Sequence, residues 1–201
     1  LILRFWCSIK FLPDTTSATP GNQMHKAIFL DRDGTLNPDP GYISNPDDFN
    51  LYEGVAEALS RLQQAGFLLI LITNQSGIAR GLITPEQLVS IHTKMQAQLA
   101  RAGARIDAIY HCPHHPDFPY KDGLAECDCR KPQPGMVLRA IKEHDIDPAA
   151  SYVVGDRSSD IKIGLKTGIT PILIGPQPIS GFEQVATFSS LGAAADWILS
   201  R

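Results

Sequence analysis

Short apolar runs alternate with amphipathic stretches from residue 24 to the end of the sequence. The runs are too short for most helices and are typical of buried strands: residues 26–31, 67–74, 106–112, 151–156 and 170–175. Apolar residues recur at helical spacing in the other stretches: residues 53–66, 84–103, 134–145, 157–168 and 193–199. This alternation predicts an α/β fold, a single doubly wound parallel sheet covered by helices.

The start of the helix expected over residues 84–103 is marked by side-chain chemistry. Thr84 is a good N-cap residue, Pro85 suits the first helical position, and Gln87 stands three residues after the cap. A threonine and a glutamine at this spacing form a capping box, in which each side chain bonds a free backbone N–H group. We therefore expect the helix to begin at this point.

Composition limits the number of domains and the class of partner. The 201 residues are 43% hydrophobic, which suffices for one good core and leaves no room for a large second domain. The net charge of −3 lacks the basic excess of a protein that grips nucleic acid. No apolar run approaches the roughly 18 residues that cross a bilayer. We expect a monomer that binds neither nucleic acid nor membrane.

The first 23 residues differ from the rest of the chain. They open with apolar residues interrupted by Arg4 and Lys10, and then become rich in Pro, Ser and Thr before Met24. A signal peptide would carry its charges before the apolar run and a small-residue cleavage site after it. We therefore expect residues 1–23 to be a disordered or non-native extension and residues 24–201 to form the domain.

Polar residues suited to phosphate chemistry follow several of the expected strands. In a parallel sheet, ligands bind beyond the carboxyl ends of the strands, and there the chain carries Asp31 with Asp33, Thr73, and Asp156. A carboxylate such as Asp31 can attack phosphorus, and Asp33 can protonate the leaving oxygen and then activate water. Mg²⁺ would reduce the repulsion between carboxylate and phosphate, and oxygen ligands such as Asp31 and Asp156 suit it.

Four motifs in order resemble those of the haloacid dehalogenase (HAD) phosphohydrolases: "DRDGT", "TNQ", "RKP" and "GDRSSD". The resemblance covers about residues 26–175 and implies an aspartyl-phosphate mechanism, with Asp31 as nucleophile and Asp33 as general acid/base. It implies that Asp31, the backbone carbonyl of Asp33, and Asp156 hold Mg²⁺. It also implies that Thr73 and Lys131 stabilise the transferring phosphoryl group. Without the family, Lys131 would be taken for a surface lysine. Asp160 is either a neighbour of the Mg²⁺ site or an ordinary helix residue.

Three of the four cysteines lie between residues 112 and 132, and two ligand pairs can be formed there. Cys112 with His114, and Cys127 with Cys129, are each separated by one residue. Three thiolates and one imidazole complete a tetrahedral Zn²⁺ shell, so we expect a structural zinc site. A strained Cys127–Cys129 disulfide or free buried thiols are the alternatives. Metal-binding cysteines suit a reducing compartment, which predicts the cytoplasm. We expect His111 and His115 to lie beside the zinc site or face solvent, and not to ligate the zinc ion.

The zinc loop narrows the resemblance. "FLDRDGTLNPDPGYISNPDDF", "LITNQSGIARG" and "CDCRKPQPGM" are similar to the D-glycero-D-manno-heptose 1,7-bisphosphate 7-phosphatases of bacterial heptose biosynthesis. These enzymes lack a large cap and act on a small phosphorylated sugar. The likeness implies that Asp39, Gly41 and Tyr42 line the substrate entrance. It also implies that Asn74, Gln75 and Ser76 contact substrate and that Arg130 recognises the far phosphate. The chain departs from this family at Arg157, where a lysine is frequent.

Other functions stay open at this point. The related histidinol-phosphatases share the zinc loop with a shorter span between its pairs. A polynucleotide 3′-phosphatase has a segment similar to "TNQSGIARG" but would need a basic surface to bind nucleic acid. A zinc-binding interaction module would explain the cysteines and leave the strand-end acids unexplained. P-loop kinases and serine hydrolases are excluded, because neither G-x-x-x-x-G-K-[ST] nor G-x-S-x-G occurs.

Overall fold

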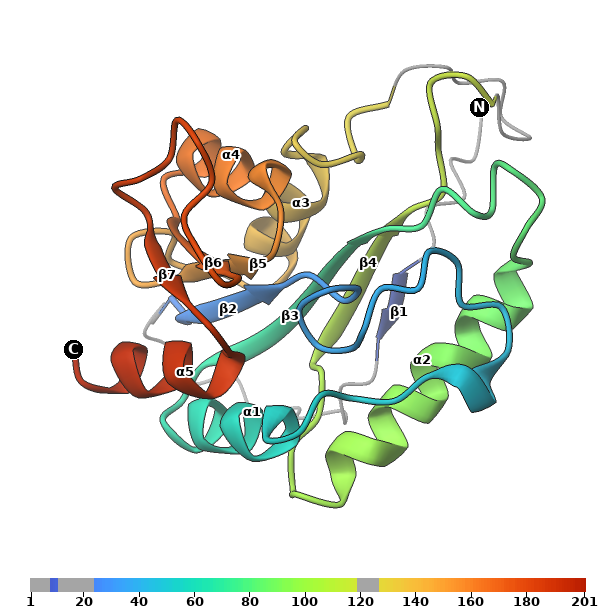
Figure 1. Ribbon diagram of the computed structural model, residues 1–201. Helices are drawn as coiled ribbons and strands as arrows, with labels where there is room; N and C mark the ends of the chain where they lie inside the picture. The colour runs from blue at the N-terminus through green and yellow to red at the C-terminus, as the bar shows by residue number, and fades with distance from the viewer. Residues whose placement is uncertain (1–7, 11–23, 119–126) are drawn as a thin grey trace.

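The computed structural model describes residues 8–10, 24–118 and 127–201. Within these ranges the strands form one sheet of order β1-β4-β3-β2-β5-β6-β7, with helices on both faces (Figure 1). The strands are β1 Ser8–Lys10, β2 Ala27–Leu30, β3 Leu68–Asn74, β4 Ala108–Cys112, β5 Tyr152–Gly155, β6 Thr170–Ile174 and β7 Ala186–Phe188. The helices are α1 Val55–Gln64, α2 Pro85–Ala100, α3 Gly135–Glu143, α4 Ser158–Thr167 and α5 Leu191–Leu199, with a 3-10 turn η1 at Pro46–Asp48.

The predicted alternation is confirmed: β2 to β6 and α1 to α5 each form within an expected stretch or overlap it. Thr84 caps α2 in a capping box with Gln87, as its sequence predicts. Two short strands were not predicted. The parallel strand β7 extends the sheet beyond β6, and β1 pairs antiparallel with β4, so the sheet is not parallel throughout. β1 lies within the expected extension, whose other residues fall outside the described ranges.

The sheet is buried on both faces because its strands alternate their side chains between two cores. In β2, Ile28 and Leu30 belong to the core beneath α1, α2 and α5. Ala27 and Phe29 belong to the core beneath α3 and α4. A strand buried on both sides needs a continuous apolar run, and all four residues of β2 are fully buried.

The strand order changes direction at β2. From β2 the chain moves outward through β3 and β4, and it then returns to place β5 against the other side of β2. Asp31 follows β2 and Asp156 follows β5, so both lie at the carboxyl edge where an open α/β sheet binds its ligands. In the described part of the chain, no helix is long and apolar enough to cross a membrane.

Candidate active site

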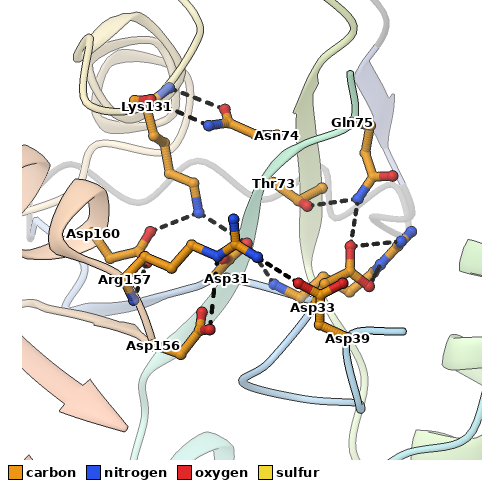
Figure 2. A network of polar contacts seen from close by, with 11 residues as sticks. Asp31, Asp33, Asp39, Thr73, Asn74, Gln75, Lys131, Asp156, Arg157 and Asp160 are labelled. Carbon is orange, nitrogen blue, oxygen red and sulfur yellow. Dashed lines mark hydrogen bonds and ion pairs between the residues drawn. The ribbon is translucent and has the colours of Figure 1, made fainter. Parts of the chain in front are cut away.

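Lys131 is the buried centre of the site. Its Nζ lies 2.8 Å from Asp31 Oδ1 and 2.7 Å from Asp160 Oδ1, and all three residues are buried (Figure 2). Burial alone lowers the pKa of Lys131, but Asp160 and Asp31 together hold it above its usual value. The lysine is therefore a fixed cation beside the expected nucleophile, and not a surface lysine.

Three carboxylates gather around this lysine. Asp31, Asp156 and Asp160 each bring an oxygen within 4.8 Å of the others, and Asp156 Oδ1 is buried without a hydrogen-bond partner among the described residues. Gly34, at φ +84°, makes the approach possible, because a Cβ there would lie 2.2 Å from Asp156 Oδ2. Hard oxygen donors at this spacing fit a divalent cation such as Mg²⁺.

The protonation of these acids reflects their crowding. Burial raises the pKa of Asp31 to about 7; Lys131 opposes the shift and Asp160 adds to it. Burial also raises the pKa of Asp156, with a further contribution from Asp160. A cation bound among the three would favour their ionised forms, so the electrostatics, like the geometry, fit a metal ion.

Asn74, at the end of β3, holds the main chain of Lys131. Its Oδ1 accepts from Lys131 N at 3.0 Å, and its Nδ2 donates to Lys131 O at 3.2 Å. We expected Asn74 to contact substrate, but both ends of its amide are bonded to the main chain of Lys131. We assign it the placement of Lys131.

Gln75, directly after β3, connects Asp33 and Thr73. Its Nε2 lies 2.8 Å from Asp33 Oδ2 and 2.9 Å from Thr73 Oγ1. Because Thr73 Oγ1 accepts from this amide, its own proton stays available for a ligand. Gln75, which we expect to contact substrate, thus also holds Asp33, the expected general acid/base (Figure 2).

The expected entrance is formed by loops that contact one another. Asp39 accepts from Gly41 N at 3.0 Å and forms an ion pair with Arg157, which reaches it from the start of α4 (Figure 2). The ring of Tyr42 lies against Gly77, where a Cβ would come within 2.9 Å of it. Ser76 lies in the same loop as Gly77. Arg157, the residue that departs from the family pattern, thus ties the loop of Asp39 to the start of α4.

The predicted zinc ligands converge. Ligand atoms of Cys112, His114, Cys127 and Cys129 lie within 4.8 Å of one another, with neighbouring separations from 3.2 Å to 3.6 Å. The three cysteines are free, so no disulfide joins them. Cys129 donates a hydrogen bond to Cys112; this bond, and then burial, raises the pKa of Cys129. Thiols this crowded become stable thiolates only beside a cation, and the set fits tetrahedral Zn²⁺.

The two residues after Cys129 diverge. Lys131 enters the core of the site, whereas Arg130 stays partly exposed and donates from Nη1 to His114 O at 3.0 Å. His115 contacts Arg80, with His115 Nε2 2.8 Å from Arg80 Nη2, and His111 is half-buried on β4. Neither histidine belongs to the four-residue cluster.

Two residues of the site were not predicted from the sequence: Arg32 was missed, and the role of Asp160 was left undecided. Arg32 is fully buried and forms an ion pair with Asp33. Asp160 is buried against Lys131, and Gly155 leaves the space it fills, since a Cβ there would lie 2.3 Å from Asp160 Cγ. The strict "GDRSSD" spacing could have indicated Asp160. No pattern distinguishes the buried Arg32 from an exposed loop arginine.

Comparison with known proteins places this geometry in a family. A Yersinia pestis protein named D-glycero-beta-D-manno-heptose-1,7-bisphosphate 7-phosphatase is 46% identical over 176 residues, covering 87% of this chain and 89% of that protein. The chain belongs to the heptose-bisphosphate phosphatase family. A Pasteurella multocida protein of the same name is 50% identical, over 70% of this chain and 76% of its own length. A family model described as HAD-hydrolase-like also matches, over residues 128–184.

Solved structures agree with membership of this phosphatase family. A D,D-heptose 1,7-bisphosphate phosphatase from B. bronchiseptica, complexed with magnesium and phosphate, has a TM-score of 0.75 and 37% identity, covering 87% of this chain and 98% of that one. A putative HAD-like phosphatase from Mesorhizobium loti has a TM-score of 0.78 and 31% identity, covering 88% and 87%. The HAD-like fold and the assignment as a phosphoric monoester hydrolase are thereby confirmed.

Proposed function

We propose that this protein removes the 7-phosphate of D-glycero-D-manno-heptose 1,7-bisphosphate in bacterial heptose biosynthesis. The observation that carries the proposal is the position of Lys131. This residue follows the last cysteine of the Cys/His cluster by two positions, yet its Nζ lies 2.8 Å from Asp31. The loop that carries the Cys/His cluster, typical of the family, thus contacts Asp31, the acid typical of the superfamily, through Lys131. The names of the close relatives favour the sugar enzyme over a histidinol-phosphatase.

The chemistry proceeds in two steps. Asp31 attacks phosphorus while Asp33 gives its proton to the leaving sugar oxygen, which leaves an aspartyl phosphate. Asp33 then takes a proton from water, whose oxygen displaces Asp31 from phosphorus. Lys131 and the Thr73 hydroxyl supply fixed donors for the charge that develops on the phosphoryl oxygens.

Two metals have separate tasks in this proposal. Asp31, the carbonyl of Asp33, and Asp156 would hold Mg²⁺, which lowers the repulsion between Asp31 and the incoming phosphate. Cys112, His114, Cys127 and Cys129 would hold Zn²⁺, whose closed coordination shell orders the loop and leaves no position for substrate. Asp160 stays with Lys131, at 2.7 Å, and keeps that lysine charged.

A phosphate-release screen tests the substrate. We expect kcat/KM for heptose 1,7-bisphosphate to exceed that for histidinol phosphate and for a 3′-phosphorylated oligonucleotide by at least about 100-fold, since a second phosphate adds charge-assisted contacts. Phosphorus NMR should identify the 1-phosphate as the product. Faster hydrolysis of histidinol phosphate would contradict the proposal.

Arg130 and Lys131 should differ in substrate dependence. Arg130→Ala should lower kcat/KM on the bisphosphate by roughly 30- to 100-fold, because hydrogen bonds to charged groups contribute about 1.5–3 kcal/mol, and much less on a monophosphate ester. Lys131→Ala should damage both substrates alike, because both pass through the same charged transition state. Steady-state kinetics on the two substrates measure the difference.

Arg61→Ala is the matched control for this comparison. Arg61 is an exposed arginine on α1 that pairs with Asp196, far in the fold from the carboxyl edge of the sheet. Its loss should leave kcat/KM unchanged for both substrates. Equal proportional losses for Arg130→Ala on both substrates would show that Arg130 does not select the second phosphate.

A further inference from the structure

Arg32 stands in sequence between the two catalytic aspartates, and its side chain is buried. Its guanidinium contacts Asp33 through two bonds, from Nε to Oδ1 at 3.0 Å and from Nη2 to Oδ2 at 2.8 Å. Arg32 is only 1% exposed, and Asp33 is its carboxylate partner among the described ion pairs. A planar fork on both oxygens fixes a carboxylate in rotation as well as in distance.

Two amides complete the environment of Asp33. Asn37 Nδ2 donates to Oδ1 at 3.0 Å, and Gln75 Nε2 donates to Oδ2 at 2.8 Å. Each oxygen of Asp33 therefore meets two donors, and none of these partners accepts a proton. When Asp33 is protonated, its O–H must find an acceptor elsewhere. The side chain is 18% exposed, which leaves the side open to ligand.

The third nitrogen of Arg32 faces a neutral group. Nη1 lies 3.4 Å from Nε2 of His92, a buried residue of α2. Burial, and then the charges of Arg32 and His111, keep the pKa of His92 well below its usual value. His92 thus receives a hydrogen bond without adding charge, and the charge of Arg32 is balanced by Asp33.

We propose that Arg32 is a positioning residue that aims Asp33, so that Asp33 exchanges its proton only with the leaving oxygen and the attacking water. The proposal rests on the phosphatase function stated above. The guanidinium of Arg32 only donates hydrogen bonds, so it takes no part in the proton transfer. In the first step the bond from phosphorus to Asp31 forms, the bond to the leaving oxygen breaks, and the proton moves from Asp33 to that oxygen. In the second step Asp33 takes a proton from water, the water oxygen bonds to phosphorus, and the bond from phosphorus to Asp31 breaks, which releases phosphate and the Asp31 carboxylate.

The test compares two monoesters that differ in their need for an acid. p-Nitrophenyl phosphate releases a stable phenolate unaided, whereas glycerol phosphate releases an alkoxide that requires a proton. Arg32→Met should lower kcat/KM for glycerol phosphate about 30-fold more than for p-nitrophenyl phosphate, because a general acid contributes roughly 10²–10⁴-fold. kcat/KM reports phosphoryl transfer to Asp31 and so isolates the acid step. Equal proportional losses on the two esters would overturn the proposal.

A double-substitution cycle separates positioning from structure. Asp33→Asn should show the same ester preference, and adding Arg32→Met to it should cost less than about twofold more, because Arg32 acts through Asp33. A loss in the double variant equal to the product of the single losses would mean that Arg32 acts independently. Either result is read on these simple esters, so the outcome for Arg32 is distinguishable from a failure of the heptose assignment.

Further variants keep the test decisive if Arg32→Met does not fold. Gln75→Met removes one donor to Asp33 without removing a charge, and should show the same ester preference at about 3- to 10-fold. Its failure to do so would overturn the proposal. Arg105→Met is the matched control: Arg105 bonds the buried Asp107 at 3.1 Å, just before β4 and so at the opposite edge of the sheet. It should show no ester preference.

Discussion

Asp31→Asn should abolish turnover, with a loss of about 10⁴-fold or more in kcat, because an amide oxygen does not form the phosphoenzyme. The fold should survive, since asparagine has nearly the same shape and Lys131 keeps Asp160 as a partner at 2.7 Å. Phosphate release measures the first expectation, and thermal unfolding in magnesium-free buffer without a chelator measures the second.

The difference in stability between the wild-type protein and Asp31→Asn should depend on pH in a defined direction. The pKa of Asp31 is raised to about 7, chiefly by burial, so its ionisation opposes folding. The wild-type protein should therefore lose stability relative to Asp31→Asn as pH rises from about 4 toward 7, and the difference should persist above 7. No such trend, or more than a few per cent of activity in Asp31→Asn, would contradict the covalent mechanism or the environment assigned to Asp31.

Asp107→Asn is the matched control for this experiment. Asp107 is also a buried aspartate, but it accepts from Leu69 N at 2.9 Å at the amino edge of the sheet. Its substitution should lower the melting temperature, because a charge-assisted bond to a buried backbone group is weakened. It should leave kcat per folded molecule unchanged.

Loss of zinc should be the second large effect. Protein purified without chelator should contain about one Zn²⁺ per chain. Cys129→Ser should lose the metal and lower the melting temperature by about 5–15 °C, as expected for roughly 2–4 kcal/mol in a domain of this size. Activity should fall at least about 100-fold, because Lys131 follows the cluster by two residues and its place depends on the loop. Metal analysis, calorimetry and kinetics check the three parts.

His115→Asn is the control within the same loop. His115 contacts Arg80 and lies outside the four-residue cluster, so its substitution should preserve the zinc content. A disulfide among Cys112, Cys127 and Cys129 together with zinc-free protein would refute the zinc site. So would a Cys129→Ser variant with unchanged metal content.

Much of the site could be predicted because strand ends are easy to find in sequence. An apolar run that stops at an acid places that acid at the edge of the sheet, as at Asp31 and Asp156. The spacing of the cysteine pairs likewise predicted a cluster that does form. β7 was missed because its three residues are only half-buried, which produces no clear apolar pattern.

The partners of the predicted residues could not be derived in the same way. Asn74 bonds a backbone 57 residues away, and that contact depends on the path of a loop that local patterns do not encode. Arg32 was missed because a charged residue between two acids is usually solvated. Its buried guanidinium contacts His92, which α2 brings to it from 60 residues along the chain.

The clamp between Asn74 and the main chain of Lys131 has a consequence for how this loop tolerates change. Asn74 and the Cys/His cluster together fix the chain on both sides of the span between His114 and Cys127. Residues inserted within that span need not shift Lys131, because the entropy of closing a loop grows only slowly with its length. A change in the length of that span would therefore leave Lys131, Asp31 and Asp160 in the same arrangement.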